Sequence, residues 1–480
     1  MTAIHALPFE LLAKIFKLVF ARGPWKLLTD QHIFDAPETD VRLLCQICSH
    51  WRAVALQTPE LWTQWIFPIL VYRRYPFQVA PPRWPAYAQS PVAGAAVDAC
   101  FARSAMLPLH VQLSTNLCEQ LVFPDSLVAA RGRWQTFCVL YTANKRSVQA
   151  EDIGCLLSLP RSGYEQLKLF KFEMHRPVDT LASDAVWQDA ICFDLRDASW
   201  LVQVVLKLPV AMRLELPLFP WEQLQHMELK YGDPKVCLDA LVRCKNAVTV
   251  KIHTTQWTES SWGVRKPKHL PCLEGLTVHV EISGTDEHLG PFLRAIRAPN
   301  LTSLDLRLLL ISPDSEDWNI SSLASTLQGF LASAQRVTRL TSFRAIDLED
   351  LPAVLSATPA LNSLTFGDPL TPIHDDFLYS FAALAGQRVA PNLTDLEFHN
   401  VGDDFSEQAF EDMIRSRWWL HGVAETDPQA SVHGLARLDR VWVTNLWPHE
   451  WDTSDLEWLI EVLKAEGLSV MYQTNNCVLN

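Results

Sequence analysis

The sequence is poor in the features that usually mark an enzyme. Only 17 of its 480 residues are glycine, and it contains none of the patterns G-x-x-x-x-G-K, G-x-G-x-x-G or G-x-S-x-G. Those patterns cradle phosphates on backbone amides or expose a nucleophilic serine on a tight turn. We therefore expect that the protein is not an enzyme and uses no cofactor.

Patterns for metals and disulfides are incomplete as well. His449-Glu450 begins like a zinc-protease helix, but Thr453 stands where the second histidine is needed. Cys45 and Cys48 have C-x-x-C spacing without a second pair, which favours a structural role over a zinc site. The eleven cysteines are odd in number, which does not fit a disulfide framework. We expect free thiols and no bound metal ion.

Charged residues are few, and acidic residues outnumber basic ones. Charged residues make up 20% of the chain, hydrophobic residues 49%, and the formal net charge is -13. This apolar fraction excludes wholesale disorder, and the negative charge argues against a general nucleic-acid partner. The longest lipid-like stretch, Trp65 to Tyr72, is far shorter than the about 20 residues that a membrane-spanning helix needs. With no basic targeting segment before Glu10, we expect a soluble protein of the cytoplasm and/or nucleus that has no membrane partner.

Residue types divide the chain into three parts. Residues 1–70 are helical in pattern and unusually apolar. Residues 71–97 contain five prolines among small residues, so they cannot hold a helix or a sheet ladder and are interpreted as a connector. Residues 98–480 form the third part, in which one short motif recurs.

The recurring motif is apolar-x-x-apolar-x-apolar, and its last two positions alternate as in a half-buried strand. It occurs as Leu224-x-x-Met227-x-Leu229, Ala247-x-x-Val250-x-Ile252, Leu273-x-x-Leu276-x-Val278, Leu301-x-x-Leu304-x-Leu306, Leu361-x-x-Leu364-x-Phe366, Leu393-x-x-Leu396-x-Phe398 and Leu438-x-x-Val441-x-Val443. The long gap after the fourth copy predicts a degenerate copy within 337–346. Helical patterns lie between copies, at about 289–296, 323–331, 377–386 and 454–467.

Short strands that alternate with helices at an irregular period are typical of leucine-rich repeats. A doubly wound sheet is the alternative, although it would not keep restating one strand motif. The predicted fold class is α+β, with a small all-α amino-terminal domain followed by an irregular α/β leucine-rich-repeat-like solenoid. The last 63 residues hold six tryptophans, which we expect to close the end of the solenoid core, with Trp442 the exception most suited to binding: Trp418, Trp419, Trp442, Trp447, Trp451 and Trp458.

The amino-terminal helices carry more apolar side chains than a small domain can bury. Pro8 suits a first helical turn, and the apolar residues after it are Phe9, Leu11, Leu12, Ile15, Phe16, Leu18, Val19 and Phe20. A second helix, at about 40–57, carries Val41, Leu43, Leu44, Ile47, Cys48, Trp51, Val54 and Ala55. Part of this surface should therefore meet a partner.

Three motifs in this region resemble the F-box. The run from Leu7 to Phe16 resembles its leading helix, the run from Ile47 to Arg52 its central V-C-x-x-W stretch, and Pro59-Glu60-Leu61-Trp62 its closing element. The resemblance covers about residues 5–66 and is interrupted by an insertion at about 21–39. Basidiomycete fungal F-box proteins commonly carry such an insertion, and their carboxyl-terminal regions are similar to this one, including an element like that from Phe410 to Trp418.

The resemblance implies that residues 1–70 are an F-box-like domain and that the chain is a substrate receptor of a SKP-cullin-F-box ubiquitin ligase. The F-box would bind a SKP-family adaptor, and through it cullin, while the repeats hold an unknown target. Carried over residue by residue, the adaptor-binding set is Leu7, Pro8, Leu11, Leu12, Ile15, Phe16, Ile47, Trp51, Leu61 and Trp62. About half of these could instead pack the helical core. A non-catalytic leucine-rich-repeat scaffold with no ligase partner is the alternative function.

Target-binding candidates are the residues that flank the inward apolar positions of each strand, because these form the exposed sheet surface of a repeat protein. They are Glu228, Lys230, Lys251, His253, Thr277, His279, Asp305, Arg307, Glu397, His399, Arg440 and Trp442. For any single residue, a solvated surface without a specific role is the alternative. Their mixed charges do not indicate the charge of a target.

Overall fold

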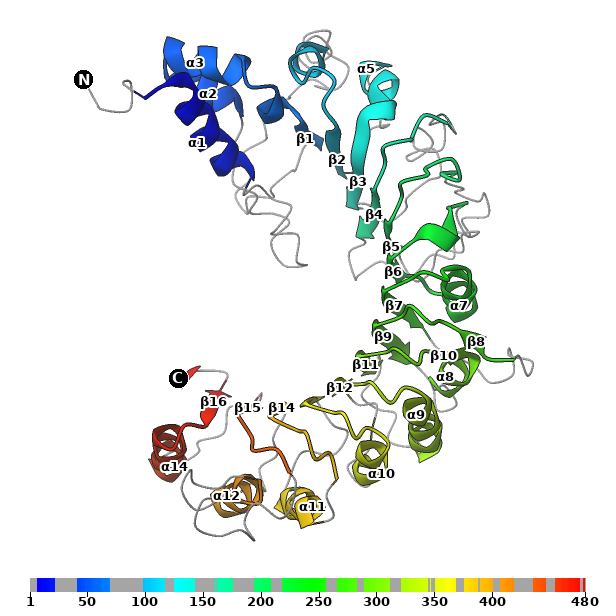
Figure 1. Ribbon diagram of the computed structural model, residues 1–480, viewed down its shortest axis with the longest axis vertical. Coiled ribbons are helices and arrows are strands. Elements are labelled where there is room, and N and C mark those ends of the chain that lie inside the picture. Colours follow the sequence, from blue (N-terminus) through cyan, green and yellow to red (C-terminus); the bar gives the residue numbers. More distant parts are fainter. Residues whose placement is uncertain are drawn as a thin grey trace, which may run out of the picture. The chain divides into compact units, whose positions relative to one another are not determined.

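The fold is known from a computed structural model (Figure 1), which describes residues 7–21, 41–69, 98–116, 125–142, 160, 162–175, 194–208, 218–255, 266–282, 289–310, 321–343, 346, 350–367, 375–386, 389–399, 406–417, 435–445, 454–474 and 478–479. The chain divides into two compact units, Met1–Pro220 and Trp221–Asn480. The predicted insertion at 21–39 and connector at 71–97 lie outside the described residues, apart from position 21, and stay predictions.

The first unit begins with four short helices. They are α1 (Phe9–Ala21), α2 (Val41–Ile47), α3 (Ser49–Leu56) and the 3-10 helix η3 (Pro59–Trp62). The carbonyl of Pro8 accepts the first bond of α1, from the Leu12 amide at 3.1 Å. Cys48 caps α3, since its Sγ accepts the Trp51 amide at 3.4 Å. The second cysteine of the C-x-x-C pattern therefore has a structural role.

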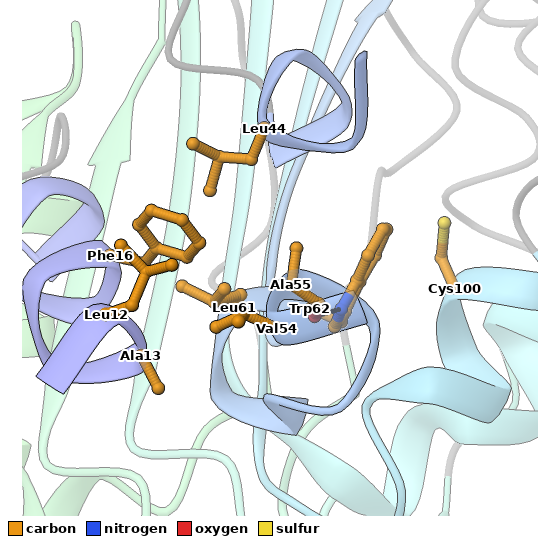
Figure 2. Close-up of a cluster of buried hydrophobic side chains, with 9 residues drawn as sticks. All are labelled: Leu12, Ala13, Phe16, Leu44, Val54, Ala55, Leu61, Trp62 and Cys100. Atoms are coloured by element: carbon orange, nitrogen blue, oxygen red, sulfur yellow. Dashed lines mark hydrogen bonds between the residues drawn. The ribbon is translucent and has the colours of Figure 1, made fainter. Parts of the chain in front are cut away.

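Figure 2 shows the buried side chains that hold these helices together. The cluster comprises Leu12, Ala13, Phe16, Leu44, Val54, Ala55, Leu61, Trp62 and Cys100. Trp62 is satisfied inside it, because its indole N–H donates to the Ala55 carbonyl at 2.8 Å. Cys100 comes from beyond the predicted connector, so residues 1–70 do not close this core alone.

The helices lead directly into a parallel sheet. A single residue separates η3 from strand β1 (Gln64–Ile69). The order continues through β2 (Leu109–Asn116), β3 (Trp134–Thr142), β4 (Leu169–His175) and β5 (Gln203–Lys207). The short helices α5 (Asp125–Ala129) and η5 (Ala130–Arg133) precede β3. Neighbouring strands in this unit are all parallel, which requires crossover connections between them.

The apolar motif also occurs in this unit, where the sequence reading missed it. Its copies are Trp134-x-x-Phe137-x-Val139, Leu167-x-x-Phe170-x-Phe172 and Leu201-x-x-Val204-x-Leu206, all buried. On these strands Cys138, Leu140, Glu173 and Val205 alternate with the motif and are buried too. On β3 both faces are buried, so the strand lacks a clear apolar–polar alternation, whereas on β4 Lys171 and Glu173 alternate with the motif and the copy was overlooked.

The second unit continues the same alternation of strand and helix. Its parallel strands, in spatial order, are β6 (His226–Lys230), β7 (Thr249–Thr255), β9 (Gly275–Ile282), β11 (Ser303–Leu310), β12 (Arg339–Phe343), β13 (Ser363–Gly367), β14 (Asp395–His399), β15 (Arg440–Asn445) and β16 (Ser469–Thr474), followed by the antiparallel β17 (Val478–Leu479). A separate two-stranded sheet pairs β8 (Lys268–His269) with β10 (Ile296–Arg297).

Helices of the second unit lie on one side of these strands (Figure 1). They are η8 (Trp221–Gln223), α7 (Pro234–Arg243), α8 (Gly290–Ala295), α9 (Ser321–Ser333), α10 (Leu351–Ser356), α11 (Asp375–Gly386), α12 (Glu407–Arg415) and α14 (Ser454–Ala465). The four predicted helical segments correspond to α8, α9, α11 and α14. Gly467 ends α14 with φ +97°, a conformation in which glycine is favoured.

The repeated motif stacks in register across this unit. Its middle positions pair strand to strand in the order Met227, Val250, Leu276, Leu304, Leu340, Leu364, Leu396, Val441 and Val470, and all are buried. Leu340 belongs to β12, so the degenerate copy predicted within 337–346 is confirmed. The strand positions read from the sequence are therefore right in this unit.

The predicted fold class, however, is wrong. The expectation was α+β, with a small all-α amino-terminal domain followed by a leucine-rich-repeat-like solenoid. Instead, η3 runs into β1, which is a strand of the parallel sheet of its own unit, and the core of the helices includes Cys100. Strands and helices alternate through both units, which supports an α/β class and nothing finer.

A buried arginine just after α12 forms hydrogen bonds to the segment that precedes β14. Arg417 donates to the carbonyls of Val389, at 2.6 Å, and Ala390, at 3.0 Å, and its guanidinium lies 5.7 Å from the centre of the Phe381 ring. Burial lowers the pKa of Arg417 to about 10. Ala390 has φ +46°, which is unusual for a residue with a side chain, so the arginine holds a strained turn.

Candidate functional site

Helix α1 has two apolar stripes, and only one of them is buried. Leu12 and Phe16 point into the helical cluster. Leu11, Ile15, Leu18 and Val19 follow i, i+4, i+7, i+8 spacing and are 41–58% exposed. The outward stripe is therefore apolar surface that the described part of the chain leaves largely uncovered.

Helix α2 repeats this arrangement on a smaller scale. Leu44 is buried in the cluster, whereas Leu43 and Ile47, four residues apart, are exposed. We use the name exposed helix set for the side chains Leu11, Ile15, Leu18, Val19, Leu43 and Ile47. Single exposed apolar residues are ordinary, but six on two short helices are unusual.

The ten predicted adaptor-binding residues fall into three groups by exposure. Leu12, Phe16, Leu61 and Trp62 are buried and hold the helical core. Pro8, Leu11, Ile15 and Ile47 are exposed, and Leu7 and Trp51 are half-buried against the cluster. Leu18, Val19 and Leu43 were missed as site residues. Their helical spacing from Leu11 and Ile47 was the signal that could have found them.

Charged contacts brace the helices around the exposed set. Lys17 on α1 forms an ion pair with Glu60 on η3, and this hydrogen bond lowers the pKa of the Glu60 carboxyl. The Arg103 guanidinium lies 4.8 Å from the centre of the Trp62 ring. The first contact joins two of the amino-terminal helices, and the second joins η3 to a residue beyond 70–97, so it positions the helices against a later part of the same unit.

The second candidate surface is the side of the second unit's sheet opposite its helices, called here the polar sheet face. It consists of the residues that alternate with the buried motif positions on β6, β7, β9, β11, β12, β13, β14, β15 and β16. The predicted target-binding residues all lie on it. Glu228, Lys230, Lys251, His253, Thr277, His279, Asp305 and Arg307 come together on four neighbouring strands.

The remaining four candidates lie on β14 and β15, beyond the intervening strands β12 and β13. Glu397 pairs directly with Trp442 across the two strands. Arg440 stands opposite Asp395, which was not among the predicted residues. The structure therefore separates the candidates into two groups.

Two histidines, His253 and His279, lie side by side in the first group. His253 Nε2 lies 2.7 Å from Glu281 Oε1, and this hydrogen bond lowers the pKa of the Glu281 carboxyl. The rings of His253 and His279 meet edge to face, 5.6 Å apart. Burial lowers the pKa of His279 to about 4, so its ring is neutral near pH 7. Beside them, Arg307 holds Asp305 through two contacts of 3.0 and 3.1 Å.

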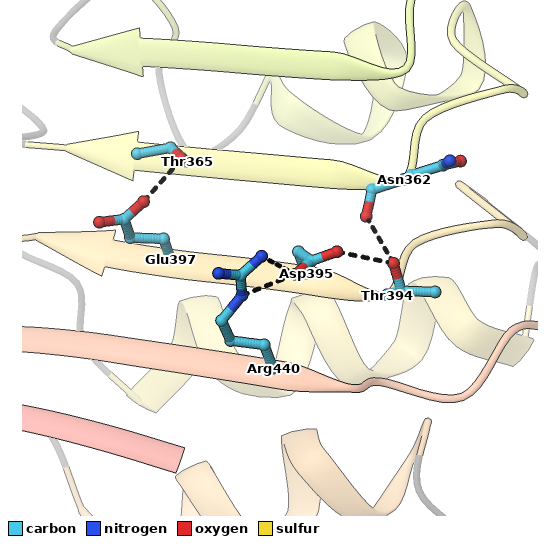
Figure 3. A network of polar contacts seen from close by, with 6 residues as sticks. All are labelled: Asn362, Thr365, Thr394, Asp395, Glu397 and Arg440. Carbon is cyan, nitrogen blue, oxygen red and sulfur yellow. Dashed lines mark hydrogen bonds and ion pairs between the residues drawn. The ribbon is translucent and has the colours of Figure 1, made fainter. Parts of the chain in front are cut away.

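Figure 3 shows the polar network of the second group. Asp395 accepts from Arg440 Nε at 2.7 Å and lies 2.8 Å from Thr394 Oγ1. Glu397 accepts from Thr365 Oγ1 at 2.9 Å. His399 Nε2 lies 3.0 Å from Glu397, and this contact is the main cause of the lowered pKa of the carboxyl. Both carboxylates are thus already engaged within the chain.

Trp442 lies half-buried beside this network. Its indole nitrogen is enclosed and has no hydrogen-bond partner among the residues that the structure describes. Trp458, on α14, is 67% exposed and does not cover the core. The other four tryptophans of the predicted cap, Trp418, Trp419, Trp447 and Trp451, lie outside the described residues.

One charged cluster of the first unit was not anticipated. Glu173 is buried, and its Oε1 lies 3.0 Å from Nζ of both Lys171 and Lys207. Register explains the contact, because Glu173 and Lys207 are direct partners on β4 and β5. Such a pairing cannot be read from the sequence until the strands are aligned.

Features of other functional classes were also sought. Among the residues that the structure describes, no helix has the length and apolar content needed to cross a bilayer. The same residues include no group of three or more His, Cys, Asp or Glu side chains placed to hold a metal ion. In comparisons with known proteins, no family model matches the chain and no curated protein shows a significant match.

Proposed function

We propose that this protein is an F-box-type substrate receptor of a SKP-cullin-F-box ubiquitin ligase, acting in the cytoplasm and/or nucleus. In this proposal α1 and α2 bind a SKP-family adaptor, which connects the chain to cullin, and the polar sheet face holds a target protein. The receptor is not an enzyme. It raises the local concentration of the target beside the ubiquitin-charged enzyme.

The exposed helix set is the observation that carries this proposal. Burying a leucine or isoleucine completely contributes about 1.5–3 kcal/mol, so covering six half-exposed side chains contributes roughly 5–9 kcal/mol. Association itself costs about 4–15 kcal/mol. The set can therefore anchor a partner, but a stable complex needs further contacts, for which Leu7, Pro8 and Trp51 are available at the edge of the cluster.

Co-expression with a SKP-family adaptor, followed by affinity purification, tests the proposal. The variant combines Leu11→Gln with Ile15→Gln, since glutamine keeps helix propensity while removing apolar surface. The matched control is Met106→Gln, which changes an 81% exposed side chain outside α1 and α2. We expect wild type and the control to co-purify with the adaptor, and the double variant to lose it while keeping its helical circular dichroism.

A second variant, Leu7→Ala with Pro8→Ala, tests the edge of the same surface without touching the exposed stripe. It should weaken adaptor binding and leave the protein soluble. If wild type does not bind the adaptor, the non-catalytic scaffold without a ligase partner becomes the better account. Adaptor binding that survives both variants would place the contact elsewhere on the chain.

A further inference from the structure

Two cysteines lie at the junction between α2 and α3. Cys45 is in the last turn of α2, and Cys48 is the single residue that separates the two helices. Both side chains are partly exposed, whereas four of the other five cysteines among the described residues are buried. Within the part of the chain that the structure describes, Cys45 and Cys48 are therefore the one closely spaced pair of accessible thiols.

The backbone brings these two thiols within reach of each other. Gln46 and Ile47, which stand between them, are both helical. Cα atoms three residues apart in a helical turn are separated by about 5 Å, inside the range of about 4.4–6.8 Å that disulfides span. The Cβ atoms of such a pair are about 5–6 Å apart and must approach to about 4 Å. A bond between the two sulfurs therefore has to shift the junction.

That shift disturbs two contacts that order the junction. Cys48 Sγ caps α3 by accepting the Trp51 amide at 3.4 Å. Cys45 packs against the helical cluster. Because a disulfide draws Cys48 Sγ toward Cys45 in the preceding helix, it removes the cap of α3.

Residues beside this junction belong to the candidate adaptor surface. Ile47, between the two cysteines, is 56% exposed and is part of the exposed helix set, and Trp51 lies half-buried at the edge of the cluster. We infer that Cys45 and Cys48 form a reversible disulfide that displaces these neighbours and lowers the affinity for the adaptor. The inference rests on the proposed function and names the regulation of that surface. Disulfides inside cells are usually of this transient, redox-sensing kind.

The oxidant is a small disulfide of the glutathione type. The thiolate of one cysteine attacks a sulfur of oxidised glutathione, which forms a mixed disulfide and releases one glutathione thiol. The other cysteine then attacks the mixed disulfide, which forms the bond between Cys45 and Cys48 and releases the second glutathione thiol. The two electrons and two protons that the protein loses are recovered in two molecules of reduced glutathione. An excess of reduced glutathione reverses the exchange.

Measuring adaptor affinity of the full-length protein after treatment with reduced or oxidised glutathione tests the inference. Mass spectrometry of the peptide that contains both cysteines reports the disulfide as a loss of two hydrogens and needs no adaptor. The variant is Cys48→Ser, because serine is a good helix cap that cannot form a disulfide. The matched control is Cys272→Ser, which removes an exposed thiol of the second unit.

Oxidised wild type should bind the adaptor about fivefold more weakly than reduced wild type, the effect expected from loss of one helix cap. Cys272→Ser should respond like wild type, and Cys48→Ser should bind equally well under both conditions. Absence of the disulfide after oxidation, unchanged affinity once it has formed, or a response that survives Cys48→Ser would overturn the inference.

Failure of the proposed function gives a different result. In that case reduced wild type binds no adaptor, although the peptide mass still shows whether the disulfide forms. Hydrogen exchange of residues 49–56 then decides the remaining point, since these amides should exchange faster in the oxidised protein if the cap is lost. Equal exchange in the oxidised and reduced proteins would overturn the inference without any adaptor present.

Discussion

The two stripes of α1 predict opposite consequences for the same substitution at neighbouring positions. Leu11 and Leu12 are both leucines, one turned outward and half exposed, the other fully buried in the helical cluster. Replacing each in turn by alanine removes the same atoms from two different environments. Only the buried position should contribute substantially to folding.

The expected magnitudes differ severalfold. Leu12→Ala leaves a cavity beside Phe16 and Val54, and comparable core substitutions cost about 2–5 kcal/mol. Leu11→Ala leaves no cavity, since solvent fills the site, so its cost should be below about 1 kcal/mol. A difference of about 3 kcal/mol corresponds to a change of more than a hundredfold in the equilibrium for local opening.

Hydrogen–deuterium exchange followed by mass spectrometry can measure this difference in peptides that cover residues 7–21, because exchange reports local opening. Leu12→Ala should lose most of the protection of α1, and Leu11→Ala should retain it. Adaptor binding should show the reverse order, with Leu11→Ala weakened more than its stability explains. Equal loss of protection in both variants would refute the assignment of the two stripes.

Three further predictions concern the second unit. Arg417→Met should lower its stability by about 3 kcal/mol, because the Val389 and Ala390 carbonyls lose a charged donor; thermal unfolding measures this, and Arg417→Lys should not fully rescue it, since one ammonium cannot reproduce the fork. Because the pKa of His279 falls from 6.5 to about 4 in the folded state, the unfolded chain binds more protons between these values, so stability should rise with pH there. His279→Gln should flatten that part of the pH profile of the unfolding temperature, and an unchanged profile would contradict this. Asn300→Ala should cost about 1 kcal/mol in the same assay, because the Asn300 amide donates to the Pro271 carbonyl at 2.7 Å.

Local patterns predicted the strands of the second unit because one of their faces is solvated. Around Leu276 and Leu304 the buried and polar residues alternate cleanly, and even the degenerate copy at Leu340 could be located from spacing. In the first unit the strand at Phe137 is buried on both faces, which obscures the motif, whereas the strand at Phe170 alternates phenylalanine with charged residues and was overlooked.

The α+β prediction failed for a different reason. Periodicity predicts a helix after Pro8 and another at about 40–57, but not whether they form a separate domain. That depends on the pairing of β1 with β2 and on the burial of Cys100 beside Trp62, which join distant parts of the chain. The cross-strand pairs His253–Glu281 and Asp395–Arg440 likewise require the alignment of neighbouring strands.

The in-register stacking of Met227, Val250, Leu276 and their successors has a practical consequence for protein engineering. Each strand is aligned by its neighbours and not by the length of the connection that leads to it. Doubling the length of a flexible connection costs only about 0.6 kcal/mol in closure entropy. A fluorescent reporter or an affinity epitope inserted between consecutive strands should therefore be accepted, so the protein can be labelled internally while both of its candidate surfaces stay open.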